Sequence, residues 1–180
     1  MAIKKPAIFL DRDGVINDVI DRGENFFVYG KKVRWTAPFK FNEFKLKTGI
    51  AATLKLIGQS GFLRILVSNQ PDITYGTMTL PEHEKIMAEV KKLPLDDIFI
   101  CVHGRDDNCE CKKPKPGMLF SAAEKHNIDL SSSYIIGDTQ SDVSAGQAAG
   151  CATVLVNSIY NQDVTADIRI KNLADIIKII

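Results

Sequence analysis

The sequence lacks long apolar runs and any excess of charge of one sign. No apolar stretch approaches the roughly 18 residues of a membrane-spanning helix, and the one near the start is too short for a secretory signal. Lysine and arginine number 23 against 22 aspartates and glutamates, a formal net charge of +1. This balance argues against a strongly basic nucleic-acid binder and against an acidic tail. We therefore expect a cytoplasmic protein with no membrane partner.

Internal repeats and low-complexity linkers are also absent from the 180 residues. Apolar residues make up 45% of the chain and charged residues 25%, as in ordinary soluble globular proteins. The length suffices for one domain with a sizeable core and is too short for two ordinary ones. The expected unit is a single domain over residues 1–180.

Cysteines are few and unevenly placed, and three of the four fall within residues 101–111. Cys101, His103, Cys109 and Cys111 form a C-x-H-x5-C-x-C pattern that satisfies a closed tetrahedral Zn²⁺ site, of the kind used for structure. Unligated thiols, or a disulfide from Cys101 to one of the other two, stay open as alternatives. Four possible ligands so close together in a cytosolic chain favour zinc. Cys151, in an apolar segment, is interpreted as a small buried residue.

Short apolar runs alternate with helical patterns along the chain. The runs that predict buried strands are residues 7–10, 63–67, 97–102, 134–137 and 153–156. Helical spacing and caps predict helices near residues 50–57, from 80 to about 93, at 117–127 and 141–150, and a short one at 172–180. For the second helix, Thr79 is the expected N-cap and Glu82 the partner in a capping box. Alternating strands and helices predict an α/β fold, a Rossmann-like doubly wound parallel sheet covered on both faces.

Residues 18–47 interrupt this alternation with a long, aromatic and basic insertion. A hairpin that turns near Gly30 is expected, placed between the first strand and its helix as a flap. A basic aromatic groove can also hold single-stranded nucleic acid, but the near-neutral total charge favours a structural hairpin. The residues that would form such a groove are Lys31, Lys32, Arg34, Lys40, Lys45, Lys47, Trp35, Phe39 and Phe41.

Polar side chains follow three of the predicted strands. In an open parallel sheet, ligands bind beyond the carboxyl ends of the strands. Carboxylates that converge there repel one another unless a hard cation lies among them, and oxygen ligands suit Mg²⁺ and phosphate substrates. The residues are Asp11 and Asp13 after the first strand, Ser68 and Asn69 after the second, and Asp138 after the fourth, with Asp142 one helical turn later.

The two acids after the first strand can perform different tasks. Asp11, ionised beside a cation, is suited to attack phosphorus. Asp13 can give a proton to the leaving oxygen and later take one from water, and Gly14 lets the backbone turn closely. Each polar pair alone could be a turn or a helix start. Their occurrence in order, each after an apolar strand, favours a phosphoryl-transfer site.

Four motifs, quoted as "DRDGV", "SNQ", "KKPKPG" and "GDTQSD", resemble those of the haloacid dehalogenase (HAD) superfamily of phosphatases. The resemblance implies Asp11 as nucleophile and metal ligand, and Asp13 as acid/base with its main-chain carbonyl on Mg²⁺. It implies Asp138 as a further Mg²⁺ ligand, with Asp142 in support. The implied phosphate-binding residues are Ser68, Asn69, Lys112 and Lys113, of which Lys113 would neutralise the phosphoryl group.

The Cys/His pattern narrows this resemblance to the branch that contains D,D-heptose 1,7-bisphosphate phosphatases and histidinol-phosphate phosphatases. The chain departs from this branch at Lys112 and at Tyr75, where arginine is usual, and in the longer insertion at 18–47. Lys113 follows Cys111 by two residues, so zinc would preorganise the lysine. The expected partner is a small phosphorylated metabolite rather than nucleic acid.

Four functions stay open from the sequence. The leading one is a Mg²⁺-dependent phosphatase of carbohydrate metabolism that acts through an aspartyl phosphate on a sugar phosphate, such as heptose 1,7-bisphosphate. Histidinol-phosphate phosphatase and polynucleotide 3′-phosphatase are the alternatives within the class. A non-catalytic, zinc-stabilised binding protein is the fourth, and the intact set of Asp11, Asp13, Lys113 and Asp138 argues against it.

Overall fold

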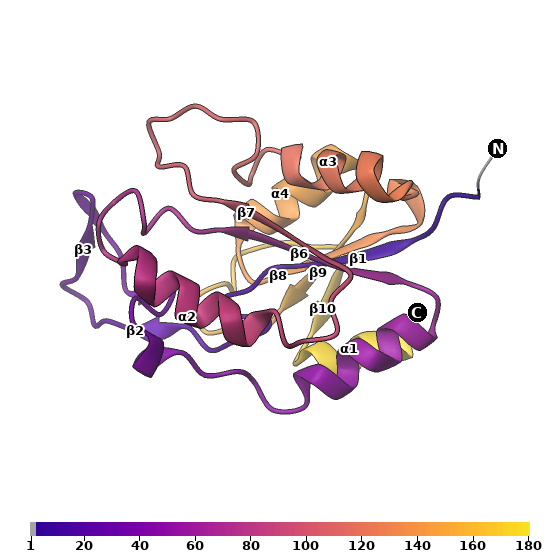
Figure 1. Cartoon of the computed structure of the whole chain (residues 1–180), viewed down its shortest axis with the longest axis horizontal. Helices are drawn as coiled ribbons and strands as arrows, with labels where there is room; N and C mark the ends of the chain where they lie inside the picture. Colours follow the sequence, from indigo (N-terminus) through magenta and orange to yellow (C-terminus); the bar gives the residue numbers. More distant parts are fainter. Residues whose placement is uncertain (1–2) are drawn as a thin grey trace.

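The computed structural model describes residues 3–180, so the first two residues of the expected 1–180 unit lie outside it. Its centre is a six-stranded parallel sheet in the order β10-β9-β8-β1-β6-β7 (Figure 1). The strands are β1 (Ala7–Leu10), β6 (Leu63–Asn69), β7 (Asp97–Cys101), β8 (Tyr134–Gly137), β9 (Ala152–Val156) and β10 (Ile168–Ile170). The chain runs outward from β1 in one direction and from β8 in the other. The predicted doubly wound α/β fold is confirmed.

The strands lie between two layers of helices because they are continuous apolar runs. One face is covered by α1 and α2 and the other by α3 and α4 (Figure 1). The helices are α1 (Ile50–Gln59), α2 (Leu80–Val90), α3 (Gly117–His126) and α4 (Gln140–Ala149), followed by the short 3₁₀ helix η3 (Leu173–Lys178) against α1. The predicted helices are confirmed, with ends shifted by a few residues.

Two strands differ from the prediction. β6 continues through Ser68 and Asn69, which pair with Ile100 and Cys101 of β7, whereas the apolar pattern ends at residue 67. β10 was not expected at all, because it is three residues long and has Arg169 at its centre. Hydrogen bonding with a neighbouring strand extends the sheet into positions where the apolar pattern gives no signal.

The start of α2 is tied to the insertion rather than closed on itself. Thr79 is the cap, as predicted, and its side chain accepts a hydrogen bond from the Glu82 main-chain N–H at 3.4 Å. The other half of the expected capping box is not made. The Glu82 carboxylate instead accepts from the main-chain N–H of Phe41 at 2.5 Å, in the short 3₁₀ helix η1 (Phe41–Glu43).

The insertion forms the expected hairpin. Its two short antiparallel ladders pair β2 (Ile20–Asp21) with β5 (Trp35–Thr36) and β3 (Phe27–Val28) with β4 (Lys31–Lys32). Tyr29 and Gly30 form the turn, both with positive φ, as two-residue hairpin turns require. At the base, Arg22 makes two bonds of 2.7 Å to the Glu43 carboxylate, and its guanidinium carbon lies 4.4 Å from the ring centroid of Phe39.

The loop that follows β7 carries His103, Cys109 and Cys111 and is called the Cys/His loop here. The hairpin lies at the same end of the sheet as this loop (Figure 1). This end is where the parallel strands finish, so both segments border the expected site. No helix among residues 3–180 is long and apolar enough to cross a membrane.

Candidate active site

Three carboxylates meet where β1 and β8 end side by side. Asp11 follows β1, Asp138 follows β8, and Asp142 lies in the first turn of α4, with one oxygen from each within 4.8 Å of the others. The close approach depends on Gly14, since a Cβ there would lie 1.8 Å from Asp138 Oδ2. The sequence predicts this convergence, and the structure places all three as expected.

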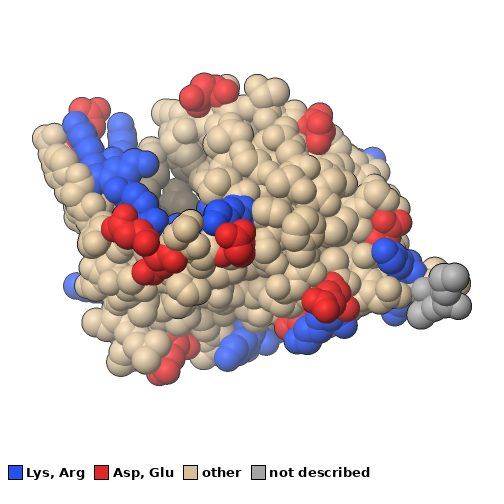
Figure 2. Space-filling view, turned by 90° about the horizontal axis from the view of Figure 1, so that it is seen from above, with Lys and Arg blue, Asp and Glu red and all other residues tan. Residues whose placement is uncertain are grey.

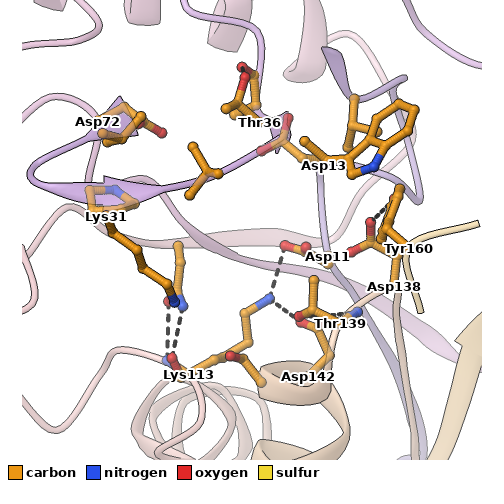
Figure 3. A pocket seen from close by; sticks show the side chains of 18 of the residues that line it. Asp11, Asp13, Lys31, Thr36, Asp72, Lys113, Asp138, Thr139, Asp142 and Tyr160 are labelled. Carbon is orange, nitrogen blue, oxygen red and sulfur yellow. Dashed lines mark hydrogen bonds and ion pairs between the residues drawn. The ribbon is translucent and has the colours of Figure 1, made fainter. Parts of the chain in front are cut away.

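Lys113 is buried among these acids (Figure 3). Its Nζ lies 2.9 Å from Asp11 Oδ1 and 2.5 Å from Asp142 Oδ1, and it donates to the Val67 carbonyl at 2.8 Å. Burial alone would lower the pKa of Lys113, but the charges of Asp11 and Asp142 outweigh burial and raise it. The lysine is therefore held as a cation directly beside Asp11.

One cation does not balance three carboxylates. The pKa of Asp11 is raised to about 6. Burial is the largest cause, the charge of Lys113 opposes it, and the charges of Asp142 and Asp13 add to it. Burial, followed by the charges of Asp11 and Asp142, also raises the pKa of Asp138. Such a set of hard oxygen donors with surplus negative charge fits a divalent cation such as Mg²⁺.

Asp142 has the most partners among the three carboxylates of Asp11, Asp138 and Asp142, here called the acidic set. Its Oδ1 pairs with Lys113, and its Oδ2 accepts from the Thr139 main-chain N–H at 3.1 Å and hydroxyl at 2.6 Å. Asp11 Oδ1 pairs with Lys113, and Asp138 Oδ2 accepts from the Tyr160 hydroxyl. Asp11 and Asp138 each keep a second oxygen for a cation, whereas Asp142 acts on Lys113 and the start of α4.

The carboxylate of Asp13 lies apart from the acidic set. It accepts from the fully buried Arg12 at 3.0 Å, from Asn17 at 2.9 Å and from Gln70 at 2.8 Å. Its expected contact with Mg²⁺ is through the main-chain carbonyl, whereas these three side chains donate to the carboxylate oxygens. Sequence reasoning missed these three partners. The only signal was their position inside or next to the quoted motifs.

The expected phosphate-binding residues are placed differently from one another. Asn69 lines the cavity and bonds both main-chain groups of Lys113, Nδ2 to O at 2.9 Å and Oδ1 from N at 3.1 Å. Ser68 is fully buried and accepts from Gln70 at 3.0 Å. Lys112 donates to the His103 carbonyl at 2.8 Å. Ser68 and Lys112 lie outside the cavity lining, and their contact with phosphate stays a prediction.

The four Cys/His side chains come together as the spacing predicts. Their ligand atoms lie within 4.8 Å of one another. Cys111 Sγ is 3.2 Å from Cys101 Sγ, 3.5 Å from Cys109 Sγ and 3.2 Å from His103 Nδ1. Metal bonds of about 2.0–2.3 Å in a tetrahedron would separate the ligands by roughly 3.5 Å. All cysteines among the described residues are free, so the disulfide alternative is not realised and the set fits zinc.

A cavity of about 390 Å³ opens between these acids, the hairpin and the Cys/His loop. Lysine and arginine atoms gather around the hollow at this end of the molecule (Figure 2). Val28, Lys31 and Trp35 contribute from the hairpin and Arg105 from the loop. Trp35 packs on Tyr160 with ring centroids 5.3 Å apart. This size suits a small metabolite.

The residues expected for a nucleic-acid groove are spread over different surroundings, since Lys31 and Trp35 line the cavity whereas Phe39, Lys40 and Phe41 line a separate pocket. Phe39 is buried against Arg22 at the hairpin base, and Arg34 pairs with Asp21 at 2.8 Å. The Lys47 ammonium donates to the Gly14 carbonyl. Lys32, Lys40 and Lys45 are exposed, so only part of the expected set lies in the cavity wall or in contacts within the protein.

Comparisons with known proteins find similarity to HAD-like hydrolases and to heptose bisphosphate phosphatases. The family described as HAD-hydrolase-like matches residues 110–175, which include Lys113, Asp138 and Asp142. The D-glycero-beta-D-manno-heptose-1,7-bisphosphate 7-phosphatase of Helicobacter pylori strain J99 is 36% identical over 153 residues, 81% of this chain and 79% of that protein. The Yersinia pestis protein of the same name is 33% identical over 193 residues, 97% of this chain and 95% of that protein.

A solved structure agrees with these sequences. The D,D-heptose 1,7-bisphosphate phosphatase from B. bronchiseptica, crystallised with magnesium and phosphate, is similar to this chain with a TM-score of 0.76 and 27% identity. The similarity covers 96% of this chain and 96% of that chain.

Proposed function

Because the chain belongs to the HAD-like family of D-glycero-beta-D-manno-heptose-1,7-bisphosphate 7-phosphatases, we propose that it is a Mg²⁺-dependent phosphatase that removes the 7-phosphate from this heptose bisphosphate. The single observation that supports the chemistry best is the placement of Asp11. Its side chain is 13% exposed, faces the cavity, and lies 2.9 Å from the buried cation of Lys113. A carboxylate so placed is a nucleophile with its charge already partnered.

In this proposal Asp11 and Lys113 act on the phosphoryl group. An oxygen of Asp11 forms a bond to phosphorus as the bond from phosphorus to the C7 oxygen breaks, which gives an aspartyl phosphate. Lys113 stabilises the negative charge of the transferred group because its ammonium already lies beside the attacking oxygen. The clamp of Asn69 on the Lys113 main chain fixes the position of this cation.

Asp13 handles the protons. It gives a proton to the departing C7 oxygen, then takes one from the water that attacks the aspartyl phosphate, and this releases phosphate and restores Asp11. In the structure its carboxylate accepts hydrogen bonds from the side chains of Arg12, Asn17 and Gln70. It must exchange one of them to reach the leaving oxygen.

Two metals fit the residues present. Mg²⁺ would be held by the Asp11 and Asp138 carboxylates and the Asp13 carbonyl, where it would offset the acidic set and polarise the phosphoryl group. Zn²⁺ would be held by the four Cys/His side chains with no open position, a structural arrangement. Because Cys111 precedes Lys113 by two residues, zinc would stabilise the segment that presents the lysine.

The test is phosphate release from heptose 1,7-bisphosphate, histidinol phosphate, a 3′-phosphorylated oligonucleotide and an aryl phosphate. We expect Mg²⁺-dependent loss of one phosphate from the heptose ester, with the highest kcat/KM of the four. Asp11→Asn should lower turnover at least about 10³-fold, since it removes the nucleophile. Asp163→Asn, a change at an exposed carboxylate outside the cavity, is the matched control. Undiminished turnover by Asp11→Asn, or a preference for histidinol phosphate, would contradict the proposal.

A further inference from the structure

Two cations line the cavity without a partner of their own. Lys31 reaches it from β4 of the hairpin and Arg105 from the Cys/His loop. Among residues 3–180, neither side chain forms an ion pair or a hydrogen bond. In Figure 3 the Lys31 side chain extends from the hairpin toward the cavity. Both are free to meet an anion that enters.

The other cations near the cavity are already engaged. Lys113 has three partners within 2.9 Å. Lys112 donates to the His103 carbonyl, and its ammonium lies 5.7 Å from the ring centroid of Tyr75. Lys115 pairs with Glu110 at 2.8 Å. Among the residues that line the cavity, the cations not paired with a carboxylate are therefore Lys31 and Arg105.

An aromatic stack holds the hairpin where Lys31 can reach inward. The rings of Tyr29, at the turn, and Tyr75 are stacked with centroids 4.7 Å apart and planes at 13°. Lys31 follows Tyr29 by two residues and pairs with Val28, which also lines the cavity. Contact between the two rings thus fixes the distance of the hairpin turn from the body of the protein.

Tyr75 also fixes the Cys/His loop. The hydroxyl of the neighbouring Thr74 donates to the Val102 carbonyl at 2.6 Å. A Cβ on Gly104 would lie 3.1 Å from the Tyr75 ring, so the loop packs closely against it. Arg105 is the next residue. One ring pair therefore sets the positions of both free cations.

We propose that Lys31 and Arg105 bind the phosphate that is not cleaved, and that the Tyr29–Tyr75 stack positions them to do so. The inference rests on the proposed function, since it requires a bisphosphate. Each phosphate carries about −1.5 to −2 charges at neutral pH. When one phosphate lies at Asp11, the other enters the same cavity and needs its own cations. The Arg105 fork can make two parallel bonds to it, and Lys31 adds a point charge.

The test compares heptose 1,7-bisphosphate with heptose 7-phosphate, which lacks the second group. The measured quantity is the ratio of kcat/KM for the two esters. Lys31→Met and Arg105→Met should each lower this ratio about 10-fold, through KM for the bisphosphate rather than kcat. Lys32→Met is the matched control, because Lys32 shares β4 but does not line the cavity, and it should keep the wild-type ratio.

The positioning role has its own readout. Tyr29→Ala should lower the same ratio by about 3-fold to 5-fold, again through KM, and Tyr29→Phe, which keeps the ring, should restore it. A merely structural role would instead change kcat for both esters together.

Failure of the inference can be told from failure of the proposed function. Suppose that the wild-type protein cleaves the bisphosphate and Asp11→Asn does not. An unchanged ratio in Lys31→Met and Arg105→Met then overturns the assignment of the two cations and leaves the function intact. If the wild-type protein releases phosphate from neither heptose ester, the proposed function is wrong, and the inference falls with it.

Discussion

The acidic set of Asp11, Asp138 and Asp142 and the hairpin line one cavity and are held in different ways. Asp11 and Asp138 follow the buried strands β1 and β8, and the buried Lys113 forms ion pairs with Asp11 and with Asp142. The hairpin has ladders of two residues each, an Arg22–Glu43 ion pair at its base, and ring contacts to the body of the protein from Tyr29 at its turn and from Trp35. In our proposals, the groups that act on the phosphoryl group therefore lie at the ends of the central strands, and a cation that binds the second phosphate lies on an element with short ladders.

The largest expected effect would come from breaking the buried side of this comparison. Lys113→Met leaves Asp11 and Asp142 as uncompensated buried carboxylates, so in metal-free buffer we expect a loss of about 3–5 kcal/mol of unfolding free energy. Urea unfolding measures it. Lys115→Met is the control, because the Lys115–Glu110 pair is exposed and worth about 0–1 kcal/mol. Equal losses in both variants would contradict the account of a buried, charge-balanced centre.

A smaller effect is expected when a ligand of the Cys/His cluster is removed, because this cluster lies next to Lys113 in the chain. Cys109→Ala should abolish stoichiometric zinc and lower turnover about 10-fold to 100-fold, because the loop would no longer fix Lys113. Metal analysis and kcat on an aryl phosphate measure the two effects. Cys151→Ala removes a buried thiol outside the cluster and should keep zinc. A zinc-free Cys109→Ala protein with normal turnover would show that the loop does not position the lysine.

The smallest effect is expected at the hairpin base and depends on pH. The hydrogen bonds from Arg22 are the main reason why the pKa of Glu43 is lowered from 4.5 to about 2. The ionised carboxylate is therefore favoured in the folded state. The stability that it adds is fully present above pH 4.5 and is lost as pH falls toward 2. Glu43→Gln should therefore cost about 2 kcal/mol at pH 7 and almost nothing near pH 2. Unfolding free energies across this range measure it, and a cost independent of pH would be contrary evidence.

The sequence predicts the acidic centre better than its surroundings, for a physical reason. Asp11 and Asp138 follow apolar strands that adjoin in the sheet, so strand order alone brings them together. The donors that hold Asp13 depend on side-chain directions, and Gln70 lies 57 residues from it in the chain. Tyr160 reaches Asp138 from a segment without any motif.

The same limit applies to the cavity wall. The turn of the hairpin was predictable from Gly30, because a two-residue turn needs positive φ. The stack of Tyr29 on Tyr75 was not, since it joins two loops 46 residues apart. The short strand β10, with an arginine at its centre, was equally hidden. Contacts between loops carry no periodic signal.

The bond from the Phe41 N–H to the Glu82 carboxylate links two elements that are otherwise only neighbours. If the hairpin base opens, the first turn of α2 loses the nearest contact that anchors its acidic residue. Amide hydrogens of the two segments should then exchange with deuterium as one cooperative unit, at a single opening free energy below that of the central strands. Opening of the hairpin base would thus be transmitted to α2 through the Glu82 carboxylate.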